Sequence, residues 1–85
     1  MKQFITIWTA KSCPEDNGGR WSPLLLDSAI AEAVRIAHRD NLKTDVLLDT
    51  VDDAGIAVKS IALAVIHGGR IAKLSAQLTT KTGGN

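Results

Sequence analysis

The sequence contains one cysteine, no tyrosine and no long hydrophobic run, and each absence excludes a class of protein. The lone thiol, Cys13, excludes an intramolecular disulfide and a zinc site built from several cysteines. One phenylalanine and two tryptophans are too few rings for a surface that stacks single-stranded nucleic acid. No apolar stretch approaches the roughly 18 residues of a membrane span, and no segment resembles a signal peptide. We therefore expect a cytoplasmic protein with no membrane partner.

An excess of charge is missing as well. Ten basic and nine acidic residues give a net charge of +1, whereas domains that bind nucleic acid strongly usually have a clear basic excess. Hydrophobic residues make up 45% of the chain, which is typical of a globular protein. A chain of 85 residues has room for one small domain. We place this domain at residues 1–78 and a flexible polar tail at 79–85. A homodimer is plausible, because a second subunit often supplements so small a core.

The first third of the chain predicts a hairpin. Residues 2–10 are rich in β-branched and aromatic side chains, which favour a strand. Residues 11–19 contain the proline, asparagine and glycines of a turn or exposed loop. Residues 20–26 can form a second strand, at a sheet edge because Pro23 has no amide hydrogen to donate. We expect these two strands to pair with each other.

The segment from Asp27 to Asn41 has the periodicity of an amphipathic helix. Either Asp27 or Ser28 can cap its first amides, and Asn41 can adopt the left-handed conformation that ends a helix. We expect the apolar arc of this helix to cover one face of an antiparallel sheet. The residues of that arc are Ala29, Ile30, Ala33, Val34, Ile36 and Ala37.

The second half of the chain contains two segments with two interpretations each. Residues 44–51 predict a strand, and residues 52–55 predict a turn. Residues 56–66 form either a second strand or an apolar helix capped by the aspartates of the turn. Their many branched side chains favour the strand. Residues 70–78 alternate as in a strand, but their alanine, lysine, leucine and glutamine favour a short helix.

These elements together predict a small α+β domain. It consists of an N-terminal hairpin, one amphipathic helix, a second hairpin and a short C-terminal element, arranged around a small antiparallel sheet. This architecture is common among small bacterial and phage proteins, and it implies no particular functional residues.

The sequence lacks the local motifs of common enzymes. It has neither the serine elbow of many hydrolases nor a glycine-rich phosphate loop. Cys13 lies near Glu15 and Asp16, which raise the pKa of a thiol and oppose its use as a nucleophile. The two histidines, His38 and His67, have no third ligand at a spacing that suits a metal. We therefore expect a non-enzymatic protein without a metal or cofactor.

Four aspartates gather in the sequence at Asp45, Asp49, Asp52 and Asp53. A calcium loop needs oxygen ligands at fixed spacing and a bidentate acid at its end, and that pattern is missing. We interpret all four as solvated side chains of a strand and a turn.

The two tryptophans also have two interpretations. If Trp8 and Trp21 pack inside, they supply a large share of a small core, and this is the interpretation we favour. If Trp21 is exposed beside Arg20, the two residues form a candidate partner anchor, because binding hot spots favour tryptophan and arginine.

The remaining functional candidates are surface residues. On the solvent face of the predicted helix, two arginines and a histidine gather, although Glu32 can pair with Arg35. We predict a small protein-binding module that acts as an inhibitor, adaptor or regulatory subunit. Its candidate partner-binding residues are Arg20, Trp21, Arg35, His38 and Arg39. The alternative is a small dimeric nucleic-acid-binding protein that places the basic helix face of each subunit on phosphates.

Overall fold

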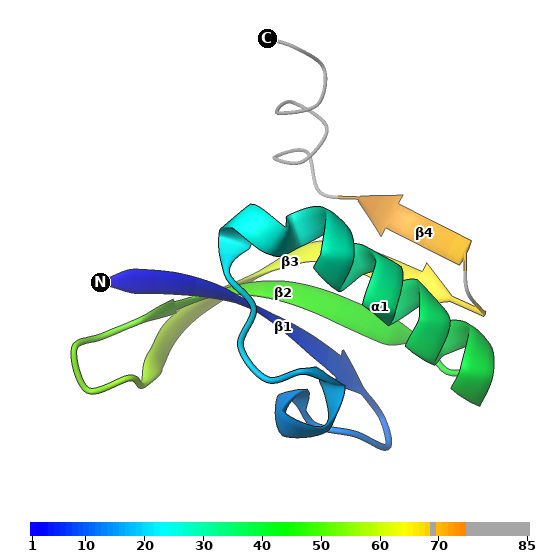
Figure 1. The fold of residues 1–85 in the computed structure, drawn as a ribbon, viewed down its shortest axis with the longest axis horizontal. Coiled ribbons are helices and arrows are strands. Elements are labelled where there is room, and N and C mark those ends of the chain that lie inside the picture. The colour runs from blue at the N-terminus through cyan, green and yellow to red at the C-terminus, as the bar shows by residue number, and fades with distance from the viewer. Residues whose placement is uncertain (69, 75–85) are drawn as a thin grey trace, which may run out of the picture.

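One α-helix lies across a four-stranded antiparallel sheet in the computed structural model, which describes residues 1–68 and 70–74 (Figure 1). The strands lie in sequence order as β1 (Lys2–Thr9), β2 (Thr44–Val51), β3 (Ala57–His67) and β4 (Arg70–Leu74). The described helices are two short 3-10 helices, η1 (Pro14–Asn17) and η2 (Pro23–Leu25), and the α-helix α1 (Leu26–Asp40). The predicted α+β class and antiparallel sheet are confirmed.

The strand β1 pairs with β2 along its whole length, from Lys2 opposite Val51 to Thr9 opposite Thr44. The predicted pairing of β1 with residues 20–26 is therefore wrong as a regular hairpin. That segment contributes a single β-bridge, in which the backbones of Ile5 and Trp21 exchange two hydrogen bonds of 2.8 Å. The chain then turns into η2, because proline at the start of a helical turn needs no donor there.

The helix α1 confirms the predicted amphipathic segment, but its beginning differs. It starts directly after η2, and Leu25 occupies the cap position with no side-chain hydrogen bond, so neither Asp27 nor Ser28 is the cap. Asn41 ends the helix with φ of 51° and donates its backbone N–H to the Ala37 carbonyl, as expected. No helix in the described part of the chain is long and apolar enough to cross a membrane.

The core forms between α1 and one face of the sheet. Three alanines of α1 are fully buried, and their small side chains allow the helix to approach the strands closely. Ile30 and Val34 are half-buried against the same cluster. The buried residues of this cluster are Ile5, Ile7, Ala29, Ala33, Ile36, Ala37, Val46, Leu63, Ala64 and Ile66.

The hairpin of β2 and β3 confirms the strand interpretation of residues 56–66. Its turn is built on Asp52, whose Oδ1 accepts the backbone N–H groups of Ala54 and Ile56, both at 2.9 Å. Gly55 adopts a φ of 81°, which a residue with a side chain rarely tolerates. The local turn chemistry therefore fixes the register of this hairpin.

The C-terminal element is a strand, and the predicted short helix is wrong for its first part. Arg70 to Leu74 pair with the end of β3, after a turn in which Gly68 has a φ of 55°. The helix propensities of single residues contribute little free energy. The free edge of β3 offers a row of backbone hydrogen-bond partners, and pairing with them outweighs those propensities. Residues 75–78 of this element and the predicted tail at 79–85 lie outside the described residues.

The two faces of the sheet differ in what covers them. Along β1, Ile5 and Ile7 are buried under α1, and the alternate residues point to the opposite side. The helix α1 does not cover that side, which we call the open face, and η1 borders it beside β1 through Pro14 and Glu15. It includes Phe4, Thr6 and Trp8 of β1, Asp49 of β2 and Ser60 of β3.

Candidate functional site

The arginines of the helix face are paired with acids of their own helix. Arg35 donates from Nε to Glu32 Oε1 at 2.8 Å and forms a second bond to the other carboxylate oxygen. This confirms the expected Glu32–Arg35 pair. Arg39 makes the same two-bond contact with Asp40, at 2.8 and 2.9 Å. These hydrogen bonds hold the pKa of Glu32 and of Asp40 below their usual values. His38 is exposed on the same helix.

Trp21 is half-buried and packs against the core. Its Nε1 donates to the Asn17 carbonyl at 3.1 Å. The ring lies against Gly18, where an added Cβ would be only 2.7 Å from the ring atom Cζ2. Packing inside, the interpretation that we favoured for Trp21, is therefore confirmed in part, because the side chain packs against the core without being fully buried.

Arg20 lies on the other side of the sheet from the helix arginines. Its Nη2 donates to the Gly55 carbonyl at 2.7 Å, and its guanidinium lies 5.5 Å from the centre of the Phe4 ring. It thus links the loop before η2 to the β2–β3 turn. Of the five predicted site residues, Arg20 lies beside the open face, whereas Arg35 and Arg39 lie on the helix face. The structure does not gather the five into one surface.

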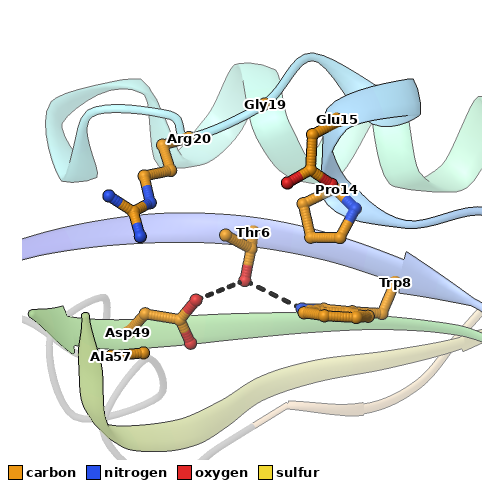
Figure 2. A pocket seen from close by; sticks show the side chains of 8 residues that line it. All are labelled: Thr6, Trp8, Pro14, Glu15, Gly19, Arg20, Asp49 and Ala57. Carbon is orange, nitrogen blue, oxygen red and sulfur yellow. Dashed lines mark hydrogen bonds between the residues drawn. The ribbon is translucent and has the colours of Figure 1, made fainter. Parts of the chain in front are cut away.

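The open face instead contains a polar network that crosses three strands, and Figure 2 shows its part on β1 and β2. Trp8 donates from Nε1 to Thr6 Oγ1 at 3.0 Å, and this hydroxyl donates to Asp49 Oδ2 at 2.9 Å. The other carboxylate oxygen, Oδ1, accepts the hydroxyl of Ser60 at 2.7 Å. Asp49 is 7% exposed and Thr6 is 2% exposed, so these hydrogen bonds are largely shielded from water.

This network corrects two predictions. Asp49 is buried and bonded to two hydroxyls, so its interpretation as a solvated strand acid is wrong. Trp8, expected in the core, is 41% exposed, because its position in β1 points away from α1. The indole is nevertheless fixed in orientation through Thr6. The result is an exposed aromatic ring on a rigid support.

A shallow hollow of about 390 Å³ lies between this network and the segment before η2 (Figure 2). Asn17 positions that segment, because its buried side-chain amide donates to the Ile7 carbonyl at the edge of β1 at 2.9 Å. The hollow combines an indole, two acids and one guanidinium. Its lining residues are Thr6, Trp8, Pro14, Glu15, Gly19, Arg20, Asp49 and Ala57.

Sequence reasoning missed Thr6, Trp8, Asp49 and Ser60 as members of one site. The available signal was the alternation of positions 4, 6 and 8 in one strand, which places Phe4, Thr6 and Trp8 on one face. Their contact with Asp49 depends on the pairing of β1 with β2, which the expected N-terminal hairpin concealed.

Cys13 is exposed, and its environment agrees with the expectation from the sequence. Hydrogen bonds with Glu15 and then Asp16 raise the pKa of its thiol, and Sγ lies 3.4 Å from Asp16 Oδ2. A raised pKa leaves less of the nucleophilic thiolate at neutral pH. Within residues 1–68 and 70–74, no three acidic, histidine or cysteine side chains gather as a metal site.

Comparisons with known proteins found no matching family model, no matching curated protein and no matching solved structure. The function is therefore argued from the geometry of the chain itself.

Proposed function

We propose that this protein is a non-enzymatic protein-binding module, an inhibitor, adaptor or regulatory subunit, whose partner docks on the open face around Trp8. The observation that carries the proposal is the state of this one side chain. Trp8 is 41% exposed, yet its indole N–H is bonded to Thr6, which is itself bonded to the buried Asp49.

A rigid, exposed tryptophan is suited to binding for two physical reasons. Tryptophan buries a large apolar area when a partner covers it and is enriched among residues that dominate binding energy. A ring held in place before binding also loses little rotamer freedom on association, so less of the contact energy is offset by ordering. A tryptophan that served mainly stability would contribute more if it were buried. Trp21 is partly buried in this way, whereas Trp8 is not.

The charges favour a protein partner over nucleic acid. On the helix face, a phosphate would have to displace Glu32 from Arg35 and Asp40 from Arg39. The hollow beside Trp8 is lined by the carboxylates of Glu15 and Asp49, which repel phosphates. The nucleic-acid alternative stays a prediction, as do the cytoplasmic compartment and the homodimer.

The test is affinity capture from host lysate with and without nuclease, using the wild-type protein and three variants. Trp8→Ala should lose a stoichiometric protein partner that survives nuclease. Leu24→Ala removes an equally apolar residue that is 94% exposed in η2, and it should keep that partner. The third variant, Arg35→Ala/Arg39→Ala, should keep it too.

Circular dichroism of each variant provides the control for folding. Two outcomes contradict the proposal. One is a partner that Trp8→Ala retains, and the other is captured material that nuclease removes and the double arginine variant loses.

A further inference from the structure

Two more hollows adjoin the central one along β1, and we call the three hollows first, central and third in their order along the strand. The first has a volume of about 400 Å³ and is lined by Lys2, Phe4, Arg20, Val51, Asp52, Asp53 and Gly55. The third has a volume of about 380 Å³ and is lined by Trp8, Thr9, Ala10, Lys11, Ser12, Cys13 and Asp16. Arg20 borders the first and central hollows, and Trp8 borders the central and third. The three hollows therefore form one row, which we call the β1 groove.

The spacing of the groove matches an extended peptide. Phe4, Thr6 and Trp8 occupy alternate positions of one strand, so successive members of this series are roughly 7 Å apart. Phe4 lines the first hollow, Thr6 the central one, and Trp8 both the central and the third. An extended peptide has the same repeat, so its alternate side chains would enter successive hollows.

The charge of the groove differs from that of the whole chain. Five carboxylates and three cationic groups line the three hollows, whereas the chain as a whole has a net charge of +1. The groove therefore complements a basic peptide rather than an acidic one. The carboxylates are Glu15, Asp16, Asp49, Asp52 and Asp53.

The central hollow has the features that a cationic side chain needs. Asp49 accepts one hydroxyl on each oxygen, although a carboxylate can accept about twice as many hydrogen bonds. No ion pair joins it to a described residue. The indole of Trp8 lies beside it and can receive a cation over its ring. The guanidinium of Arg20 is engaged with Gly55 and the Phe4 ring, at the border with the first hollow.

We propose that the β1 groove binds an extended segment of the partner protein and that its central hollow receives a lysine or arginine side chain. Asp49 and Glu15 supply the opposite charge, and Trp8 supplies the flat apolar wall. This inference rests on the proposed function and specifies the chemistry of the partner at the same site.

The two tryptophans allow a direct test by nuclear magnetic resonance. Each indole N–H of the ¹⁵N-labelled protein gives its own signal, and Trp8→Phe assigns them. The probe is a blocked pentapeptide of threonine, valine, arginine, valine and threonine, titrated into the full chain at low salt. The Trp8 signal should shift in a saturable way, and the Trp21 signal should stay in place, because Trp21 lines none of the three hollows.

Matched peptides and variants identify the charge requirement. Replacing the central arginine of the probe by glutamate should weaken binding at least about fivefold, because it removes a partly exposed ion pair and places a like charge beside Glu15 and Asp49. Glu15→Gln, at an exposed residue, should also weaken binding of the arginine peptide, and it should leave the fold unchanged. Asp49→Asn should weaken it further. Asp27→Asn, at an exposed acid of α1 that lines none of the three hollows, is the charge-matched control and should bind like the wild type.

Several outcomes overturn this inference. Equal binding of the arginine and glutamate peptides, or no shift of the Trp8 signal at millimolar peptide, removes the basic-peptide site. A shift caused by raising the protein concentration alone assigns the groove to a second copy. A shift with a short single-stranded oligonucleotide in place of the peptides assigns it to nucleic acid. If the peptides fail but Trp8→Ala still loses its captured partner, the proposed function stands and only the partner chemistry is wrong.

Discussion

The helix face and the open face both contain charged side chains, but they use them differently. On the helix face, each arginine is paired with an acid one or three positions away, and both arginine side chains are more than half exposed. On the open face, one buried carboxylate joins three strands and fixes an exposed ring. Charge alone therefore does not distinguish a functional surface. Burial and long-range hydrogen bonding do, because they hold a group in one geometry.

The largest expected effect comes from removing the carboxylate that joins the strands. Asp49→Ala leaves the hydroxyls of Thr6 and Ser60 without their acceptor, so we expect the free energy of unfolding to fall by about 3 kcal/mol. Asp40→Ala on the helix face should leave the urea midpoint unchanged. Urea denaturation of both variants measures the contrast. Equal losses in the two variants would remove the distinction between the two faces.

The packing of Trp21 against the loop before η2 can be perturbed without touching the network. Gly18 has a φ of 90°, and a Cβ at this position would meet the Trp21 ring at 2.7 Å. We expect Gly18→Ala to lower the free energy of unfolding by about 2 kcal/mol, whereas Gly19→Ala, with no atom within 4 Å of its added Cβ, should cost less. Thermal unfolding of both variants is the measurement. A larger loss for Gly19→Ala would contradict the packing described for Trp21.

A smaller effect on stability is expected where an aromatic ring stays in place but the indole is replaced by a smaller phenyl ring without a donor. Trp8→Phe loses the N–H that bonds to Thr6, while Thr6 keeps its bond to Asp49. We expect a loss of at most about 1 kcal/mol in the free energy of unfolding, and a clear loss of the captured partner. If partner capture and stability fall in proportion, the ring serves the fold and not binding.

The smallest effect is a pH dependence on the helix face. Arg35 holds the pKa of Glu32 below its usual value, so the pair stabilises the folded state above about pH 4.3, the value expected for an unfolded glutamate. That stability is lost as the pH falls through the lower folded pKa. Glu32→Gln should therefore lower the urea midpoint slightly at pH 7 and by less at pH 3. A larger fall of the urea midpoint at pH 3 than at pH 7 would contradict this pH dependence, because the pair would then stabilise the folded state more at acidic pH.

The parts of the fold that local patterns determine were predictable. The spacing of alanines and isoleucines identified α1, and a turn with two aspartates and a glycine identified the β2–β3 hairpin. The pair of Glu32 and Arg35 was predictable for the same reason, since residues three apart meet on a helix. The type of the C-terminal element was not predictable, because its sequence suits both a strand and a helix.

The candidate site could not be predicted because it depends on pairing between distant segments. Thr6 and Asp49 are 43 positions apart, and they meet only because β1 pairs with β2 and not with the segment that follows it in the sequence. The expectation that neighbouring strands pair placed Trp8 opposite the wrong segment. Once β1 and β2 are paired, alternation alone places Trp8 on the open face.

The bridge between Ile5 and Trp21 has a consequence for the behaviour of the chain at high concentration. β1 is an edge strand, and unpaired edges attract the strands of other molecules. Here the bridge occupies the outward backbone groups of Ile5, and the Asn17 amide occupies the Ile7 carbonyl. Strand addition and the growth of fibrils are therefore obstructed along this edge. A peptide bound nearby has to lie over the face of the sheet and cannot extend it as a further strand.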